Sequence, residues 1–156
     1  IRLSRARNVC LKLARYLDPT YYLVVDFDSI AVGLTKKGFL SIFKRKEDWA
    51  SISANSKNDY YYDIWALRTK DDFLNYDFWD YKYDKSLNKI KIKPSQFLEV
   101  VSAFGGLAIY KMSYTKNCFY YGFKNNREHC EHVHFHKQMT SKNNAKHYIL
   151  GKLTVN

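Results

Sequence analysis

Over the first 17 residues, apolar side chains recur at steps of three and four, which is the spacing of one face of an α-helix. The apolar members of this face are Leu3, Ala6, Cys10, Leu13 and Leu17. The basic residues Arg2, Arg5, Lys12 and Arg15 fall largely outside it. Asp18-Pro19 follows, and a residue before proline avoids helical backbone angles. The pattern therefore predicts an amphipathic helix over residues 1–17.

The period changes at the next segment, Tyr21 to Ile30, whose β-branched run is typical of a short buried strand. The run ends in Asp26 and Asp28, which leave the same face because side chains alternate along a strand. Two close carboxylates repel each other and favour a cation between them. Their oxygens suit Mg²⁺ and Mn²⁺, often together with substrate phosphates. The alternative is a strand followed by an ordinary polar turn.

Three further segments have recognisable patterns. Glu47 to Asn55 alternates as a strand does, and His147 to Val155 predicts a last strand after a turn at Asn143-Asn144. Thr69 to Tyr83 is acidic and aromatic and predicts a helix or an ordered loop over the site. Its helical form would begin with Thr69 as the N-cap and Asp72 as the capping-box acid.

Two segments suit either a packed core or a bound ligand. Phe97 to Tyr110 holds two apolar runs around Gly105-Gly106. This glycine pair indicates a hairpin or a backbone pressed against a ligand, and both readings stay open. Tyr60 to Arg68 is an aromatic cluster that ends in a cation. Such a cluster can hold a base or a sugar ring, or it can form a core strand with an exposed arginine.

All five histidines lie in the last fifth of the chain, most of them between Glu128 and His136. On a strand, Cys130, His132, His134 and His136 would share one face, whereas on a helix His132 and His136 would do so. Either geometry can present imidazole to a metal. The paired spacing usual for zinc is absent. The plain alternative is a polar helix start with incidental histidines.

Composition narrows the class of protein. A length of 156 residues with 46% hydrophobic and 17% aromatic residues predicts one globular domain. The helix that leads directly into the acidic strand would form half of a βαβ unit and so favours an α/β class. A net charge of +11 predicts an anionic partner: nucleotide, nucleic acid, membrane surface or acidic glycan. Three scattered cysteines favour reduced thiols and a cytoplasmic setting. No apolar run reaches the roughly 20 residues that a membrane span requires.

The motifs, in order, resemble those of the GT-A-type nucleotide-sugar glycosyltransferases, most of all the small branch in large DNA viruses of algae and amoebae, the chlorovirus and mimivirus type. The motifs that carry the resemblance are Arg7-Asn8, Asp26-x-Asp28, Tyr61-Tyr62-Asp63-Ile64-Trp65-Ala66-Leu67-Arg68, Ser102-Ala103-Phe104-Gly105-Gly106-Leu107-Ala108, and Cys130-Glu131-His132 with His136 downstream. They span nearly the whole chain. Asp-x-Asp alone is weak, but the ordered set is more specific.

The resemblance implies a GT-A fold, that is, a Rossmann-like single domain over residues 1–156 that lacks its first strand. It also implies a Mn²⁺ or Mg²⁺ ion on Asp28 that bridges the two phosphates of the donor. Asp26 would contact the ribose or the metal. His136 would complete the metal shell, with His134 and His147 as alternatives.

The resemblance further implies that Glu131 and His132 are catalytic, with the carboxylate facing the acceptor hydroxyl. The implied nucleotide-sugar-binding residues are Arg7, Asn8, Asp26, Trp65, Arg68, Gly105 and Gly106. The expected reaction is transfer of a sugar from a nucleoside-diphosphate donor, of the UDP-sugar type, to a hydroxyl of a glycan or glycoprotein. No nucleic-acid partner and no membrane span are expected, and a virus-encoded enzyme would act in the host cytoplasm.

Two alternatives come from other classes. The basic charge and the many tyrosines would also suit a nucleic-acid-binding module, although the basic residues are interleaved with acids rather than gathered in one block. The Asp26–Asp28 pair with the histidines would also suit a metal-dependent nuclease.

Overall fold

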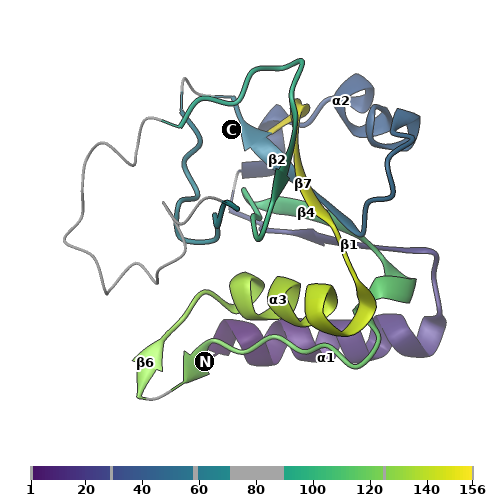
Figure 1. Cartoon of the computed structure of the whole chain (residues 1–156), viewed down its shortest axis with the longest axis vertical. Helices are drawn as coiled ribbons and strands as arrows, with labels where there is room; N and C mark the ends of the chain where they lie inside the picture. Colours follow the sequence, from purple (N-terminus) through teal and green to yellow (C-terminus); the bar gives the residue numbers. More distant parts are fainter. Residues whose placement is uncertain (1, 29, 58–59, 71–89, 125, 156) are drawn as a thin grey trace.

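The computed structural model describes residues 2–28, 30–57, 60–70, 90–124 and 126–155. Its centre is a five-stranded mixed sheet in the order β1-β4-β2-β7-β3 (Figure 1). The strands are β1 (Tyr21–Val25), β2 (Ser51–Ser56), β3 (Phe97–Val100), β4 (Leu107–Lys111) and β7 (His147–Val155). Strands β2 and β7 are parallel, and every other neighbouring pair is antiparallel. A separate small ribbon pairs β5 (Phe123–Lys124) with β6 (Arg127–Glu128).

Helices cover both faces of the sheet. Helices α1 (Arg2–Leu17) and α3 (Glu131–Asn143) lie along one face, and α2 (Lys36–Leu40) lies on the other (Figure 1). The short 3₁₀ helices are η1 (Ile30–Gly33), η2 (Ile42–Lys44) and η6 (Met112–Thr115). Along β4, Ala108 and Tyr110 join the core beneath α1 and α3, whereas Leu107 and Ile109 join the core on the α2 side. This alternation is what a strand buried on both faces requires.

The fold is therefore mixed α/β, as predicted, and its layers are compatible with a Rossmann-like arrangement. The strand expected within residues 47–55 is β2, and the expected last strand is β7. The turn before it is confirmed by Asn144, which ends α3 in the left-handed conformation (φ 52°). The histidine segment is a helix from Glu131 onward. The three cysteines are free thiols.

Helix α1 exists where predicted, but the predicted buried face was wrong. Its buried residues are Ser4, Arg7, Leu11 and Ala14. Leu3, Leu13 and Leu17, which belong to the predicted apolar stripe, are more than half exposed. The helix is turned so that Arg7 points inward, where it finds partners on other elements.

Strand β1 is less buried than its apolar sequence suggested. It stands at one end of the strand order β1-β4-β2-β7-β3, where it pairs with β4. Only Val24 is buried, whereas Tyr21 and Leu23 are 38% and 43% exposed. Its register places Val25 opposite Leu107, so the next residue, Asp26, arrives beside Gly106 and donates its backbone N–H to the Gly106 carbonyl at 2.9 Å.

The glycine pair does not form a hairpin. Strand β3 pairs with β7, and β4 pairs with β1 and β2, so the chain passes from the far edge of the sheet to its interior. Gly105 and Gly106 both have positive φ (64° and 78°), which glycine adopts without strain. A Cβ on Gly105 would lie 2.5 Å from the Ala54 carbonyl oxygen. The close approach at Gly105 is thus to the protein's own backbone.

The predicted segment Tyr60 to Arg68 is irregular rather than a strand. It joins the sheet only through an isolated bridge between Arg68 and Ser102. Most of the segment Thr69 to Tyr83, including Asp72, lies outside the described residues.

Candidate active site

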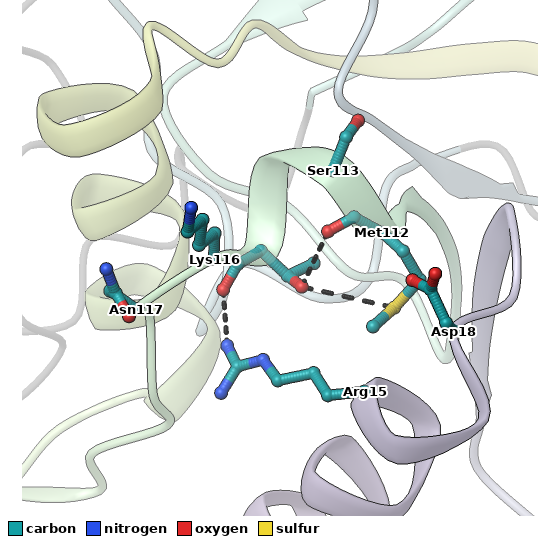
Figure 2. A pocket seen from close by; sticks show the side chains of 7 residues that line it. Arg15, Asp18, Met112, Ser113, Lys116 and Asn117 are labelled. Carbon is teal, nitrogen blue, oxygen red and sulfur yellow. Dashed lines mark hydrogen bonds between the residues drawn. The ribbon is translucent and has the colours of Figure 1, made fainter.

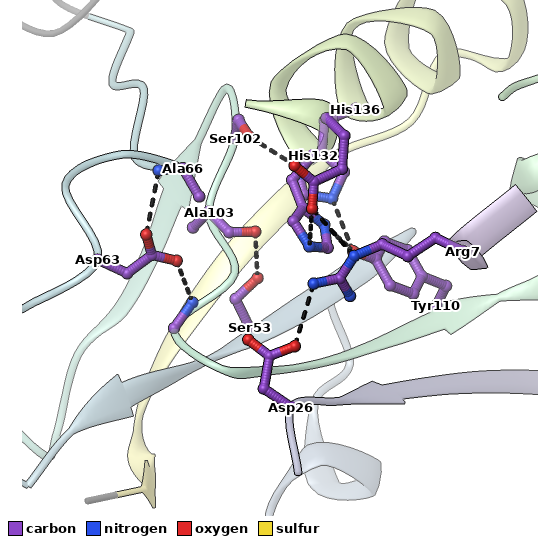
Figure 3. A network of polar contacts seen from close by, with 12 residues as sticks. Arg7, Asp26, Ser53, Asp63, Ala66, Ser102, Ala103, Tyr110, His132 and His136 are labelled. Carbon is purple, nitrogen blue, oxygen red and sulfur yellow. Dashed lines mark hydrogen bonds and ion pairs between the residues drawn. The ribbon is translucent and has the colours of Figure 1, made fainter. Parts of the chain in front are cut away.

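Acidic side chains from two separate segments bond to one arginine. Arg7, in the middle of α1, donates from Nε to Glu131 Oε1 and from Nη2 to Asp26 Oδ1, both at 3.0 Å. Figure 3 shows its guanidinium directed at Asp26. Asp26 directly follows β1, and Glu131 is the first residue of α3. Arg7 therefore holds the end of a strand and the start of a helix together.

Asp28 and Asp63 complete the acidic group. Asp28 is exposed, yet its charge acts to raise the pKa of Asp26. Asp26 and Glu131 in turn act to raise the pKa of Asp63. Asp26, Asp28, Asp63 and Glu131 are named the carboxylate group below.

Burial controls the charges in this group. It raises the pKa of Asp26, although the ion pair with Arg7 opposes the rise. It also raises the pKa of Asp63, against two backbone N–H groups that favour the ionised form. For Arg7, burial acts to lower the pKa, but Glu131 and Asp26 outweigh it, so that the pKa lies above its ordinary value. Arg7 also lies over the Phe104 ring, 4.7 Å from its centroid.

Asp63 ties the glycine loop to the carboxylate group. Its Oδ2 accepts the Gly105 N–H at 2.9 Å, and its Oδ1 accepts the Ala66 N–H at 3.2 Å (Figure 3). On the other side of the loop, Gly106 accepts the backbone N–H of Asp26. The positive-φ glycine pair is thereby held between two acidic residues of the site.

The predicted metal site is not assembled as expected. His136 is fully buried, and both of its ring nitrogens have partners: Nδ1 lies 3.0 Å from Ser102 Oγ, and Nε2 lies 3.1 Å from Tyr110 OH. Among the described residues, no group of three or more histidine, cysteine, aspartate or glutamate side chains is arranged to hold a metal ion. Asp26 and Asp28 remain neighbours, but the structure does not bring His136 to them. The alternative His147 is also buried, with both ring nitrogens within hydrogen-bond distance of other groups.

Other predicted donor-binding residues have structural partners. Asn8 donates to the Tyr120 carbonyl and accepts the Tyr120 N–H, both at 2.8 Å. Arg68 is buried and donates to the carbonyls of Trp65 and Leu67. Trp65 is half-buried against the core beneath α1 and α3. Of the predicted donor set, Arg7, Asp26 and the glycine pair are brought together.

The sequence analysis gave no site role to Asp63, although it lies in one of the motifs, and none to Tyr110. Asp63 had a signal, since it is the only acid in the aromatic segment Tyr60 to Arg68. Tyr110 had none, because it is one of 14 tyrosines and its role depends on α3, which follows about 20 residues later. Its hydroxyl contacts both His132 and His136.

A separate pocket of about 280 Å³ lies at the other end of α1 (Figure 2). Its lining includes Arg15, Asp18 and Lys116. The Arg15 guanidinium donates to the carbonyls of Thr115 and Cys118 and thereby ties the helix to the loop after η6. None of the residues in the carboxylate group lines this pocket.

Comparison with family models, with curated proteins and with solved structures found no match to this chain. Within the described part of the chain, no helix has the length and apolar character required to cross a membrane.

Proposed function

We propose that this chain is a metal-dependent glycosyltransferase domain that uses a nucleoside-diphosphate sugar. The observation that carries the proposal is the carboxylate group itself. The buried Arg7 pairs with Asp26 and Glu131, Asp28 repels Asp26, and Asp63 is repelled by Asp26 and Glu131. Such mutual repulsion is tolerated where cations or reacting groups balance it. The order of the motifs along the chain adds support by resemblance.

The acidic corner formed by Asp26 and Asp28 fits a divalent ion that is held mostly by its substrate. Mg²⁺ commonly takes one or two carboxylates and completes its shell with water and phosphate oxygens. A bound Mg²⁺ or Mn²⁺ would supply positive charge to the leaving diphosphate. His136 does not fit this shell, because it is buried and bonded at both nitrogens.

Glu131 is the residue that we assign to the acceptor. Its position as the first residue of α3 favours a carboxylate, because the helix N-terminus carries partial positive charge. Arg7 binds its Oε1 and fixes the side chain. A carboxylate held in this way can accept the proton of an acceptor hydroxyl within hydrogen-bond reach.

The first test is calorimetric titration of the protein with UDP, GDP, CDP and ADP, in Mn²⁺ and then in EDTA. We expect binding that requires the metal and prefers one base. Binding unaffected by EDTA would contradict the metal-dependent site. Absence of nucleotide binding, together with DNA or RNA binding that falls steeply with salt, would favour the nucleic-acid-binding alternative.

Asp28→Asn tests the assignment of the site. Because Asp28 is exposed, we expect a change in unfolding free energy within about 0.5 kcal/mol. We also expect metal-dependent nucleotide affinity to fall at least about tenfold, since one metal ligand loses its charge. Asp18→Asn is the matched control: Asp18 is exposed, has φ 47°, which asparagine also tolerates, and lines the pocket at the other end of α1. Unchanged affinity in Asp28→Asn would overturn the assignment.

A further inference from the structure

A continuous chain of polar side chains runs through the core beneath the carboxylate group (Figure 3). Ser102 Oγ lies 3.0 Å from His136 Nδ1, His136 Nε2 lies 3.1 Å from Tyr110 OH, and Tyr110 OH lies 3.2 Å from His132 Nδ1. All four side chains are buried. The chain ends at His132 Nε2, which lies 3.7 Å from Glu131 Oε1 and has no hydrogen-bond partner among the described residues.

The hydroxyl of Tyr110 sets the direction of this chain. It has one proton and two lone pairs, and the neighbouring Tyr120 hydroxyl acts as a donor toward one of these lone pairs. With that lone pair occupied, Tyr110 donates to one of the two neutral imidazoles and accepts from the other. If it donates to His132 Nδ1, then His136 Nε2–H donates to Tyr110, Ser102 donates to His136 Nδ1, and His132 carries its proton on Nε2. If every bond reverses, His132 Nε2 presents a lone pair to Glu131.

Charge decides between these two arrangements. A lone pair on His132 Nε2 facing the Glu131 carboxylate is repulsive, whereas an N–H is attractive. Arg7, bonded to the same Oε1, favours the carboxylate form of Glu131. The His132 ring cannot turn away readily, because it stacks on Phe104 with a centroid distance of 3.9 Å and an interplanar angle of 15°. Burial also keeps both rings neutral by lowering the pKa of His132 and of His136.

We infer that Tyr110, backed by His136 and Ser102, fixes His132 as the Nε2–H tautomer, and that this N–H orients the Glu131 carboxylate. At 3.7 Å the N–H acts on Glu131 through charge, and a closure of about 0.5 Å would make it a hydrogen bond. His132, His136 and Tyr110 are thus positioning residues. The positioning role rests on the proposed function, in which Glu131 accepts a proton, but the tautomer assignment does not.

His147 provides an internal reference. Its Nε2 lies 3.2 Å from the His136 carbonyl oxygen and 3.1 Å from Thr140 Oγ1, and its Nδ1 lies 2.7 Å from Ser51 Oγ. A carbonyl only accepts, so His147 also carries its proton on Nε2. Its tautomer is therefore set without the hydroxyl of Tyr110.

The test is long-range ¹H–¹⁵N correlation NMR of the full chain labelled in histidine, near neutral pH. We expect His132, His136 and His147 each to be neutral with the proton on Nε2. In Tyr110→Phe, we expect His147 to keep its tautomer while His132 and His136 lose their single form. Tyr61→Phe is the matched control, because it removes a buried hydroxyl that is not part of the hydrogen-bonded network. We expect it to leave all three histidine signals unchanged. Thermal unfolding checks that both variants are folded.

Two results would overturn the inference: a proton on Nδ1 of His132 in the native protein, or unchanged tautomers in folded Tyr110→Phe. If Tyr110→Phe fails to fold, Ser102→Ala serves instead, because it removes the Ser102 hydroxyl from the end of the hydrogen-bonded network. We expect His136 to be the first histidine to populate both tautomers in this variant. The positioning role predicts a kcat about 10- to 100-fold lower in Tyr110→Phe with donor KM unchanged. Failure of the native protein to bind nucleotide would remove the proposed function and leave the NMR result to decide the tautomer.

Discussion

Helices α1 and α3 lie side by side under the same sheet, and both bury polar side chains, but α1 leaves many of its apolar side chains exposed whereas α3 buries its own (Figure 1). The buried residues of α3 include Glu131, His132 and His136. Helix α1 exposes much of its apolar stripe, including Leu13 at 59%, while burying Arg7. Burial in this layer therefore follows the availability of polar partners as much as hydropathy. A buried polar group is stable where it is hydrogen-bonded, and exposed apolar residues are common on any protein surface.

The comparison extends to how each helix is held. Helix α1 is fastened by polar contacts at three points along its length: Arg7 to the carboxylate group, Asn8 to Tyr120, and Arg15 to the carbonyls after η6. Helix α3 is fastened from within by its histidines, which bond to side chains of the sheet and the adjoining loops. Both helices thus depend on buried polar contacts, and the predictions below separate these contacts from apolar packing.

The largest expected effect is on the α3 side and concerns pH. Burial lowers the pKa of His132 and His136 well below the usual value, and that of His147 to about 4. Below about pH 6.5 the unfolded chain binds protons that the folded chain does not, so stability present above pH 6.5 is lost as pH falls toward 4. Three such groups make the loss up to about 3 kcal/mol between pH 6.5 and 5.5, and larger at lower pH. The raised pKa values of Asp26 and Asp63 act in the opposite sense and reduce this slope.

Urea unfolding at pH 7.5, 6.5 and 5.5 measures this dependence. His147→Gln should remove about one third of the slope, because it removes one of the three titrating groups. Ser141→Ala, on the exposed side of α3, is the control: it removes no histidine and should leave the slope close to that of the native protein. Equal slopes in His147→Gln and in the native protein would mean that His147 is not held neutral in the core.

Arg7→Met probes the contact that joins the two helices. It leaves Glu131 and Asp26 without their common partner, and removing one member of a buried ion pair costs about 3–5 kcal/mol. Because Asp26 is one-third exposed and can be partly hydrated, we expect the lower end of this range. The control is Arg5→Met in the same helix, where the exposed position predicts a change within about 0.5 kcal/mol. Equal stabilities of the two variants in urea would show that Arg7 is not an organising residue.

Arg7 also shows where sequence reasoning reached its limit. The three- and four-residue spacing predicted helix α1 correctly, because periodicity is a local property. The buried face was wrong because Arg7 bonds to Glu131, which lies 124 positions away, and no local pattern reports such a partner. Likewise the strand end with Asp26 was visible, whereas Asp63 and Tyr110 belong to the site only through the crossing of distant segments.

The third prediction concerns apolar packing along α1, and its lower limit is the smallest of the three. Leu11 is fully buried in the core beneath the helix, whereas Leu13, two positions later, is 59% exposed. Leu11→Ala deletes buried methyl groups and leaves a cavity, so we expect a loss of about 2–5 kcal/mol in unfolding free energy. Leu13→Ala is the matched control and should change it by no more than about 0.5 kcal/mol, since alanine has the higher helix propensity and little packing is lost. Urea unfolding of both variants measures the two changes in unfolding free energy. If Leu13→Ala were the more destabilising variant, the buried face of α1 would be the one predicted from hydropathy, and Arg7 would not lie in the interior.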